Sequence, residues 1–331
     1  MVRVLVAGII AMVVSIVVGP KFIAFLRRNE FGQHIREEGP ERHAAKQGTP
    51  TMGGLLVVVT ATLSFLAVSK YTVPGLAVMF TAVACGAIGF VDDFIKLTHR
   101  RSLGLSGRWK LLLLGLVTIG VSLAARHQHL PTDMKIPIVH FNLQLSYAWY
   151  GLLFFVIAGA TNGVNLTDGL DGLAAGTGII ALLAFTLINV VAFIRLRFDT
   201  KLDMAIAGAA LIGALVGFLW YNAFPAEVFM GDTGAMAVGG ALAALAIFTQ
   251  TTFLLLLIGG IFLIEALSVI VQVFSFKYFG RRVLLMAPLH HHFEMKAWSE
   301  TKVMVRFWIV TAILCATGFA LYYRDFLYFT R

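Results

Sequence analysis

The sequence predicts an all-α integral membrane protein with about ten transmembrane helices, organised as a single polytopic domain over residues 1–331. Of the residues, 59% are hydrophobic and only 13% are charged. Soluble domains are closer to about half apolar and a quarter charged. The mean hydropathy is +0.86. Apolar runs extend along the whole chain, so we expect no separate soluble module.

The apolar runs have the length that a helix needs to cross a bilayer, about 20 residues. The first run is too long for the apolar core of a signal peptide, so we expect it to be retained. The ninth contains Gly259 and Gly260 and is longer than a straight crossing needs, which predicts a tilt or a break. The predicted spans are 4–26, 52–69, 74–95, 109–125, 146–161, 173–194, 203–221, 234–250, 252–278 and 306–323.

The charges orient these spans in the membrane. Most Lys and Arg residues fall in one alternate set of loops, which the positive-inside rule assigns to the cytoplasm. An even number of spans places both termini on the same side of the membrane, and the basic loops on the cytoplasmic side then place them outside. The net charge of +9 follows from this asymmetry, and without a basic recognition motif it does not indicate nucleic-acid binding. Residues 127–145 lie outside, and the alternation in HFNLQL predicts a small hairpin.

Polar side chains gather in the cytoplasmic loops, in KQGTPTMGG, VDDFIK, NLTDGLDG, FMGDTGA and PLHHHFE. Asp92 and Asp93 end the third span, where acids oppose the helix dipole, so we interpret them as functional. Lys96 is spaced to pair with Asp92 or to bind a phosphate. These stretches predict one active-site cleft on the cytoplasmic face.

Two more acids lie in NLTDGLDG. If the sixth span begins there, Asp168 and Asp171 share one side of a helix and gain from its N-terminal dipole. A role as helix cap would explain one of these acids. It would not explain two acids together with Gly169 and the other polar residues of this stretch. Asp232 begins the eighth span, where a simple N-cap is the alternative to a functional role.

Several carboxylates that face one pocket require a cation. Oxygen ligands without cysteine favour Mg²⁺ or Mn²⁺ over zinc. The run His290, His291 and His292 is poorly spaced for one zinc ion, so we interpret it as phosphate or substrate contacts. Together with the nearby Lys and Arg residues, these groups fit phosphoryl transfer at the membrane surface.

The same stretches resemble the polyprenyl-phosphate N-acetylhexosamine-1-phosphate transferases. The similarity covers GTPTMGG, FVDDFIK, NLTDGLDGLA, NAFPAEVFMGDTGA, APLHHHFE and WSETKVMVRFWIV in order. PLHHHFE and KQGTPTMGG favour the branch that uses N-acetylmuramoyl-pentapeptide over the relatives that use N-acetylglucosamine.

The resemblance implies ten transmembrane helices with both termini outside, a homodimer in the cell membrane and dependence on Mg²⁺. It implies transfer of phospho-MurNAc-pentapeptide from UDP-MurNAc-pentapeptide to undecaprenyl phosphate, which gives lipid I and UMP. The catalytic residues it implies are Asp92, Asp93, Asp232 and His291, with Asp232 as the metal ligand. The substrate-binding residues are Lys46, Thr51, Lys96, Asn165, Asp168, Gly169, Leu170, Asp171, Asn222, Phe229, Gln272, His290 and His292.

Two mechanisms stay open. Asp92 acts as a base on the lipid phosphate, which attacks the nucleotide directly, or an aspartate attacks first and forms a covalent intermediate. We favour the direct route because the lipid phosphate is already anionic. The competing functions are a sibling transferase for UDP-GlcNAc and an ion-coupled transporter or flippase. Transporters hold carboxylates near the membrane midplane, where this chain has Glu265.

Overall fold

The computed structural model describes residues 1–29, 48–99, 104–137, 139 and 141–329. Its helices, in chain order, are α1 (Val2–Arg28), α2 (Gly54–Val68), α3 (Val73–Thr98), α4 (Gly107–His127), α5 (Ala148–Thr167), α6 (Leu173–Leu196), α7 (Asp199–Asn222), α8 (Gly231–Phe248), η2 (Thr252–Leu254), α9 (Leu255–Ile258), α10 (Gly260–Phe279), α11 (Leu289–Met295) and α12 (Glu300–Phe329). The predicted hairpin is confirmed as β1 (Asp133–Ile136) antiparallel to β2 (Phe141–Gln144).

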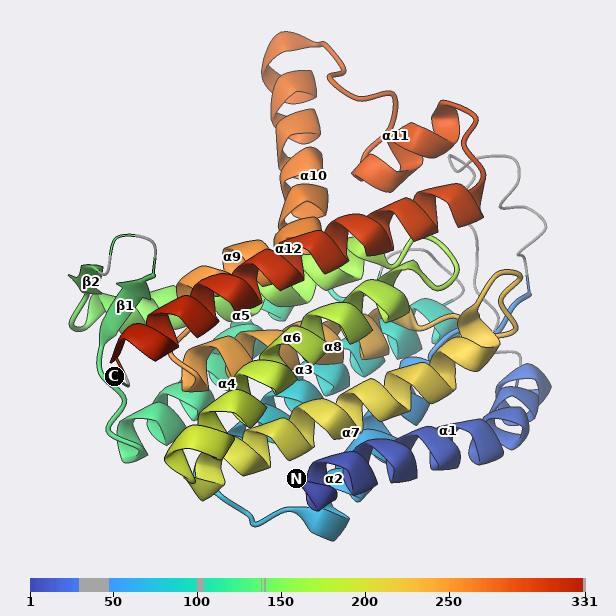
Figure 1. Cartoon of the computed structure of the whole chain (residues 1–331). Helices are drawn as coiled ribbons and strands as arrows, with labels where there is room; N and C mark the ends of the chain where they lie inside the picture. The colour runs from blue at the N-terminus through green and yellow to red at the C-terminus, as the bar shows by residue number, and fades with distance from the viewer. Residues whose placement is uncertain (30–47, 100–103, 138, 140, 330–331) are drawn as a thin grey trace.

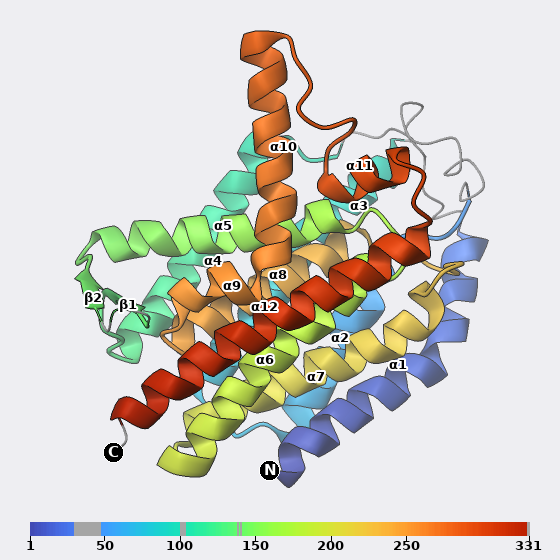
Figure 2. The same ribbon diagram turned by 45° about the horizontal axis from the view of Figure 1, so that its top comes forward.

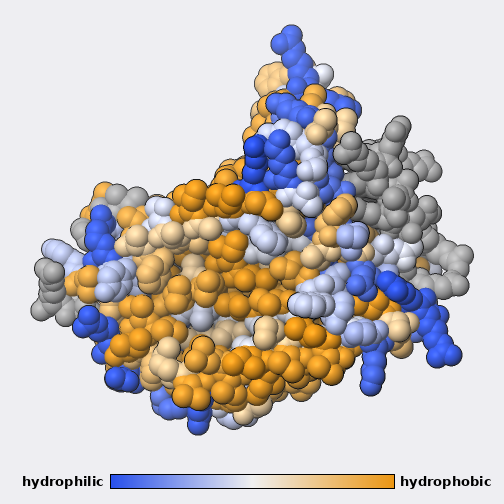
Figure 3. Space-filling view, turned by 45° about the vertical axis from the view of Figure 1, so that its right-hand side comes forward, coloured by the Kyte–Doolittle hydropathy of each residue, from blue (hydrophilic) through white to orange (hydrophobic). Residues whose placement is uncertain are grey.

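The predicted all-helical membrane architecture is confirmed by the length and the apolar composition of the helices. Within the described ranges, nine helices are long and apolar enough to cross a bilayer, and α2 is a shorter apolar helix. Each predicted span corresponds to a helix or, for the ninth, to a broken pair. A band of apolar side chains covers the body of the bundle (Figure 3), and the exposed Leu5, Ile9 and Val13 of α1 belong to such a lipid-compatible surface.

Helix α8 lies at the centre of the bundle. From Thr233 to Phe248 its residues are buried, because α3 packs along one side and α5 along another. Its sequence is rich in Gly and Ala, and such small residues allow helix backbones to approach closely in a membrane. Helices α1, α6 and α7 form the neighbouring layer.

The predicted interruption of the ninth span is confirmed at Gly259, which separates α9 from α10. After this break α10 projects away from the bundle, and the chain returns through residues 281–288 to α11 (Figures 1 and 2). Both termini lie at one end of the bundle, and α11 lies at the opposite end. The loops that carry the polar stretches are therefore brought to the end remote from the termini.

Candidate active site

The segment before α2 and the segment before α8 pair through their backbones. The Phe229 N–H donates to the Pro50 carbonyl and the Gly53 N–H donates to the Phe229 carbonyl, both at 2.8 Å. Thr51 is buried in this pairing, and a Cβ added at Gly231 would lie 3.0 Å from its hydroxyl oxygen. Two stretches far apart in the sequence thus form one wall of the site.

Three acids meet where α3 and α8 cross. Ligand oxygens of Asp92, Asp93 and Asp232 lie within 4.8 Å of one another. This proximity depends on Gly89, because a Cβ there would come within 2.2 Å of the Asp232 carbonyl oxygen. Asp92 and Asp93 are buried, and Asp232 is slightly more accessible.

Asp93 differs from the other two acids in its partners. Its carboxylate accepts the backbone N–H of Asp232 at 3.2 Å, and the backbone N–H and hydroxyl of Thr233 at 3.0 and 2.8 Å. It therefore caps the N-terminus of α8 from a neighbouring helix, so the capping role considered for Asp232 falls to Asp93. The Asp93 Oδ1 also lies 3.9 Å from the Lys96 Nζ.

Two lysines lie between Asp92 and Asp232. The Lys96 Nζ is 2.6 Å from Asp92 Oδ2 and 3.1 Å from Asp232 Oδ1. The Lys110 Nζ is 3.1 Å from Asp92 Oδ1 and 2.9 Å from Asp232 Oδ2. The pairing expected for Lys96 is thus present, and Asp92 also accepts the Leu105 N–H at 2.7 Å.

Lys110 was missed as a site residue by sequence reasoning. It lies near the start of α4, where a cation is disfavoured by the helix dipole. That misplaced charge is the signal that could have found it, although its partners on α3 and α8 are visible only in the folded chain.

The predicted start of the sixth span at residue 173 is confirmed, so the condition under which Asp168 and Asp171 would share one side of a helix is not met. Helix α5 continues to Thr167 and α6 begins at Leu173, so both acids lie in the connection between the two helices. The turn is permitted by Gly172, whose φ is +74°. We call residues 168–172 the DGLDG loop.

The DGLDG loop is tied to the loop that precedes α8. The Ala226 N–H donates to Asp171 Oδ2 at 3.0 Å. Asn222 accepts the Gly172 N–H at 3.1 Å and donates to the Val228 carbonyl at 2.9 Å. Asp171 and Asn222 thus hold the two loops together.

Asp168 faces the acidic cluster. Burial and, after it, the charges of Asp232 and Asp93 together raise the pKa of its carboxyl to about 8, while the backbone N–H of Gly231 partly opposes the shift. The shift follows first from burial and then from the neighbouring carboxylates, so Asp168 belongs electrostatically to the acidic cluster.

The three histidines lie on α11, which packs against α10 and α12. His290 is buried, and its ring lies 4.2 Å from that of His291 between centroids. The His291 Nδ1 is 2.5 Å from Glu294, and the His292 Nδ1 accepts the Leu285 N–H at 3.1 Å. Burial, and secondarily Lys296, lower the pKa of His292.

The remaining predicted residues have distinct surroundings. Gln272 accepts the N–H groups of Val283 and Leu284 and donates to the Leu284 carbonyl, so its amide holds the segment after α10. Leu170 is buried, whereas Asn165 and Phe229 are half-buried. Lys46 lies outside the described residues.

Comparison with known proteins identifies the family. The sequence profile of glycosyl transferase family 4 matches residues 75–250, and signature 1 of the phospho-N-acetylmuramoyl-pentapeptide-transferases matches residues 46–58. The chain is 47% identical to the phospho-N-acetylmuramoyl-pentapeptide-transferase of Rubrobacter xylanophilus, over 98% of each chain. It is 46% identical to that of Desulforudis audaxviator, over 97% of this chain and 98% of the relative. The chain belongs to the phospho-N-acetylmuramoyl-pentapeptide-transferase family.

Membership of this family confirms the resemblance inferred from the motifs. The stretch matched by the glycosyl transferase profile contains the acidic cluster and the DGLDG loop, whereas the histidines of α11 lie beyond it. The phospho-N-acetylmuramoyl-pentapeptide-transferase signature covers the segment whose backbone pairs with Phe229 and Met230.

Proposed function

We propose that this protein transfers phospho-MurNAc-pentapeptide from UDP-MurNAc-pentapeptide to undecaprenyl phosphate, giving lipid I and UMP. This is the first membrane step of peptidoglycan synthesis. The observation that carries the proposal is the near full-length identity to proteins named for this transfer, together with an acid–lysine cluster suited to phosphates. Lysine ammonium groups stabilise charge that develops on phosphoryl oxygens.

In the reaction we propose, an oxygen of the lipid phosphate forms a bond to the β-phosphorus of the nucleotide. The bond from this phosphorus to the bridging oxygen breaks, and UMP leaves with that oxygen. Asp92 accepts the proton of the lipid phosphate when it carries one, and Lys96 and Lys110 hold the diphosphate between α3, α4 and α8. We retain the direct attack over a covalent aspartyl intermediate.

The donor set fits a divalent cation. The oxygens of Asp92 and Asp232 face lysine ammonium groups, and Asp92 also accepts the Leu105 N–H, whereas the oxygens of Asp93 accept hydrogen bonds from the start of α8. We propose Asp232 as the principal ligand of Mg²⁺, with Asp92 beside it. When bound, the ion would neutralise charge on the carboxylates and on the substrate phosphates.

The DGLDG loop and Phe229 form the proposed nucleotide pocket, in which the ring of Phe229 stacks on uracil. We propose that His291 acts in catalysis and that Lys46, Thr51 and the remaining predicted residues contact the donor substrate. The segments before α2, α6 and α8, together with α11, lie at the end of the bundle opposite the termini, and Gln272 lies on the projecting α10. Ten crossings with both termini outside then place the cleft in the cytoplasm, in a homodimer.

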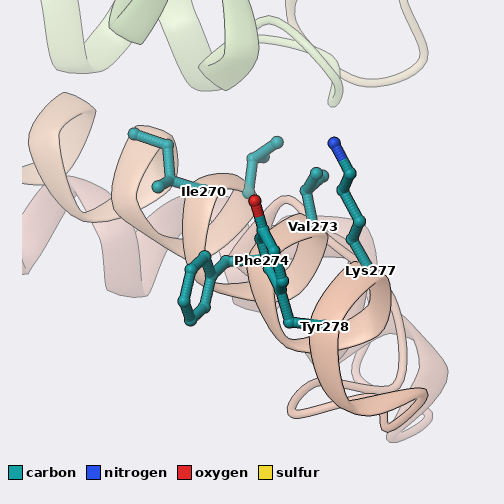
Figure 4. Close-up of a pocket in the computed structure, with 6 residues that line it drawn as sticks. Ile270, Val273, Phe274, Lys277 and Tyr278 are labelled. Atoms are coloured by element: carbon teal, nitrogen blue, oxygen red, sulfur yellow. The ribbon is translucent and has the colours of Figure 1, made fainter.

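We propose that the acceptor lipid approaches along α10. An open groove on this helix is lined by Val269, Ile270, Val273, Phe274, Lys277 and Tyr278 (Figure 4). Its apolar side chains suit a prenyl tail, and Lys277 suits an anionic head group. A photoreactive polyprenyl phosphate is expected to label α10, and a labelling pattern confined to other helices would contradict the groove.

The decisive experiment is magnesium-dependent release of UMP by the purified protein in detergent, with undecaprenyl phosphate present. UDP-MurNAc-pentapeptide is expected to give UMP, and UDP-GlcNAc is expected to give none. Chelation of divalent ions is expected to abolish release, and added Mg²⁺ to restore it. Turnover of UDP-GlcNAc alone would instead assign the sibling activity.

A further inference from the structure

Glu265 is a fully buried acid on α10, shortly after the break at Gly259. A buried carboxylate is costly unless hydrogen-bond donors surround it. Its Oε2 accepts the Leu289 N–H at 2.7 Å, and its Oε1 accepts the His290 N–H at 3.2 Å. The His290 Nδ1 also lies 3.2 Å from Oε1. Glu265 therefore binds both the first backbone turn of α11 and the side chain of its first histidine.

These contacts fix the tautomer of His290. Carboxylate oxygens accept hydrogen bonds, so the Nδ1 beside Oε1 carries a proton and donates it. Nε2 is buried without a hydrogen-bond partner among the described residues. A Cβ added at Gly169 would lie 2.2 Å from Nε2, so this atom rests directly on the DGLDG loop. The contact tolerates a lone pair, whereas an N–H would point at the Gly169 backbone.

We propose that Glu265 is a positioning residue that acts through His290: it holds the imidazole in the Nδ1–H form against Gly169 and thereby sets the position of the DGLDG loop. The inference rests on the proposed function, which assigns this loop to the nucleotide pocket. It explains why an acid is buried on α10, remote from the acidic cluster.

The segment between α10 and α11 has independent anchors. Gln272 holds the backbone of Leu284, and the Ser275 hydroxyl donates to the Arg281 carbonyl at 2.8 Å. Loss of Glu265 alone therefore leaves the returning segment attached to α10. A change at Glu265 is expected to act on the histidine rather than to release the whole segment.

The test compares E265Q, H290N and the double variant as full-length proteins in detergent. In E265Q only one of the two oxygens remains an acceptor, so the side chain can no longer accept from both the Leu289 N–H and the His290 donors. In H290N the amide still reaches toward Glu265, but the atom that rests on Gly169 is lost. S268A is the matched control, because Ser268 is a neighbour on α10 whose hydroxyl donates only to the Glu265 carbonyl at 2.6 Å.

E265Q is expected to raise the KM for UDP-MurNAc-pentapeptide about 10- to 100-fold, the range for loss of a buried charged hydrogen bond. The KM for undecaprenyl phosphate is expected to stay unchanged, and S268A to behave as wild type. H290N is expected to match E265Q, and the double variant to lose no more than either. A smaller active fraction would lower Vmax and move neither KM.

Multiplicative losses in the double variant, or an unchanged nucleotide KM in E265Q, would overturn the proposal. A second measurement does not depend on the folding of E265Q or on activity. Imidazole ¹⁵N shifts of wild type, with His290 assigned by its absence from H290N, are expected to show a protonated Nδ1 and an unprotonated Nε2. The reverse tautomer would also overturn it. Failure of wild type to release UMP would count against the proposed function alone.

Discussion

Two buried carboxylates at opposite ends of the bundle have opposite surroundings. Asp203 on α7 is fully buried and accepts the hydroxyl of Ser69, the N–H of Lys70, and the N–H and hydroxyl of Thr72, at 2.8 to 3.0 Å. Asp232 faces other carboxylates and two lysine ammonium groups.

The difference lies in what holds each charge. The donors around Asp203 are backbone groups and short hydroxyls that cannot leave, so this acid closes the connection between α2 and α3 and has no capacity left for a ligand. The lysines beside Asp232 are on flexible side chains, which can exchange the carboxylate for a phosphate or give way to a cation. Burial alone therefore does not distinguish a functional acid from a structural one.

The largest effect is expected for D232N. Asparagine keeps the size of the side chain but removes the charge that would bind a cation and orient the lysines. We expect UMP release to fall by at least about 10³-fold, as for loss of a central electrostatic group, with thermal stability close to wild type. Activity near wild type in D232N would show that Asp232 is not the functional acid of the pair Asp203 and Asp232.

D203N is expected to show the opposite pattern. Removal of one partner from a buried charged network costs about 3 kcal/mol, so we expect a lower unfolding temperature in detergent. The kcat per folded molecule is expected to stay at the wild-type value. The control is D199N, which removes a partly exposed pair with Lys70 and is expected to cost under about 1 kcal/mol. A D203N protein that folds normally but lacks activity would reverse our interpretation.

A smaller effect is expected for K110M. The variant removes one ammonium group from the acidic cluster and leaves Lys96 in place, so we expect kcat to fall about 10- to 100-fold. K70M is the matched control, because Lys70 pairs with an acid at the other end of the bundle. Equal kcat values for K110M and K70M would remove Lys110 from the proposed site.

The spacing of residues along the chain was sufficient to predict part of this site. The pairing of Asp92 with Lys96 follows from helical spacing, and the break at Gly259 follows from paired glycines in an overlong span. The start of the sixth span at residue 173 was also predicted, whereas the conditional helical placement of Asp168 and Asp171 was not met, because both precede the turn at Gly172. Asp93 as the cap of α8 was not predictable, since its donors lie on a helix remote in sequence.

The sequence by itself determined a helical membrane protein, its family and the stretches that carry its polar chemistry, because hydropathy, spacing and motif are properties of neighbouring residues. Only the tertiary structure decided which partners surround each acid. Asp203 and Asp93 are satisfied by fixed donors, Asp232 faces Lys110, and Glu265 reaches His290. The physical reason is that the cost of a buried charge depends on the partners that folding brings to it, and these come from distant parts of the chain.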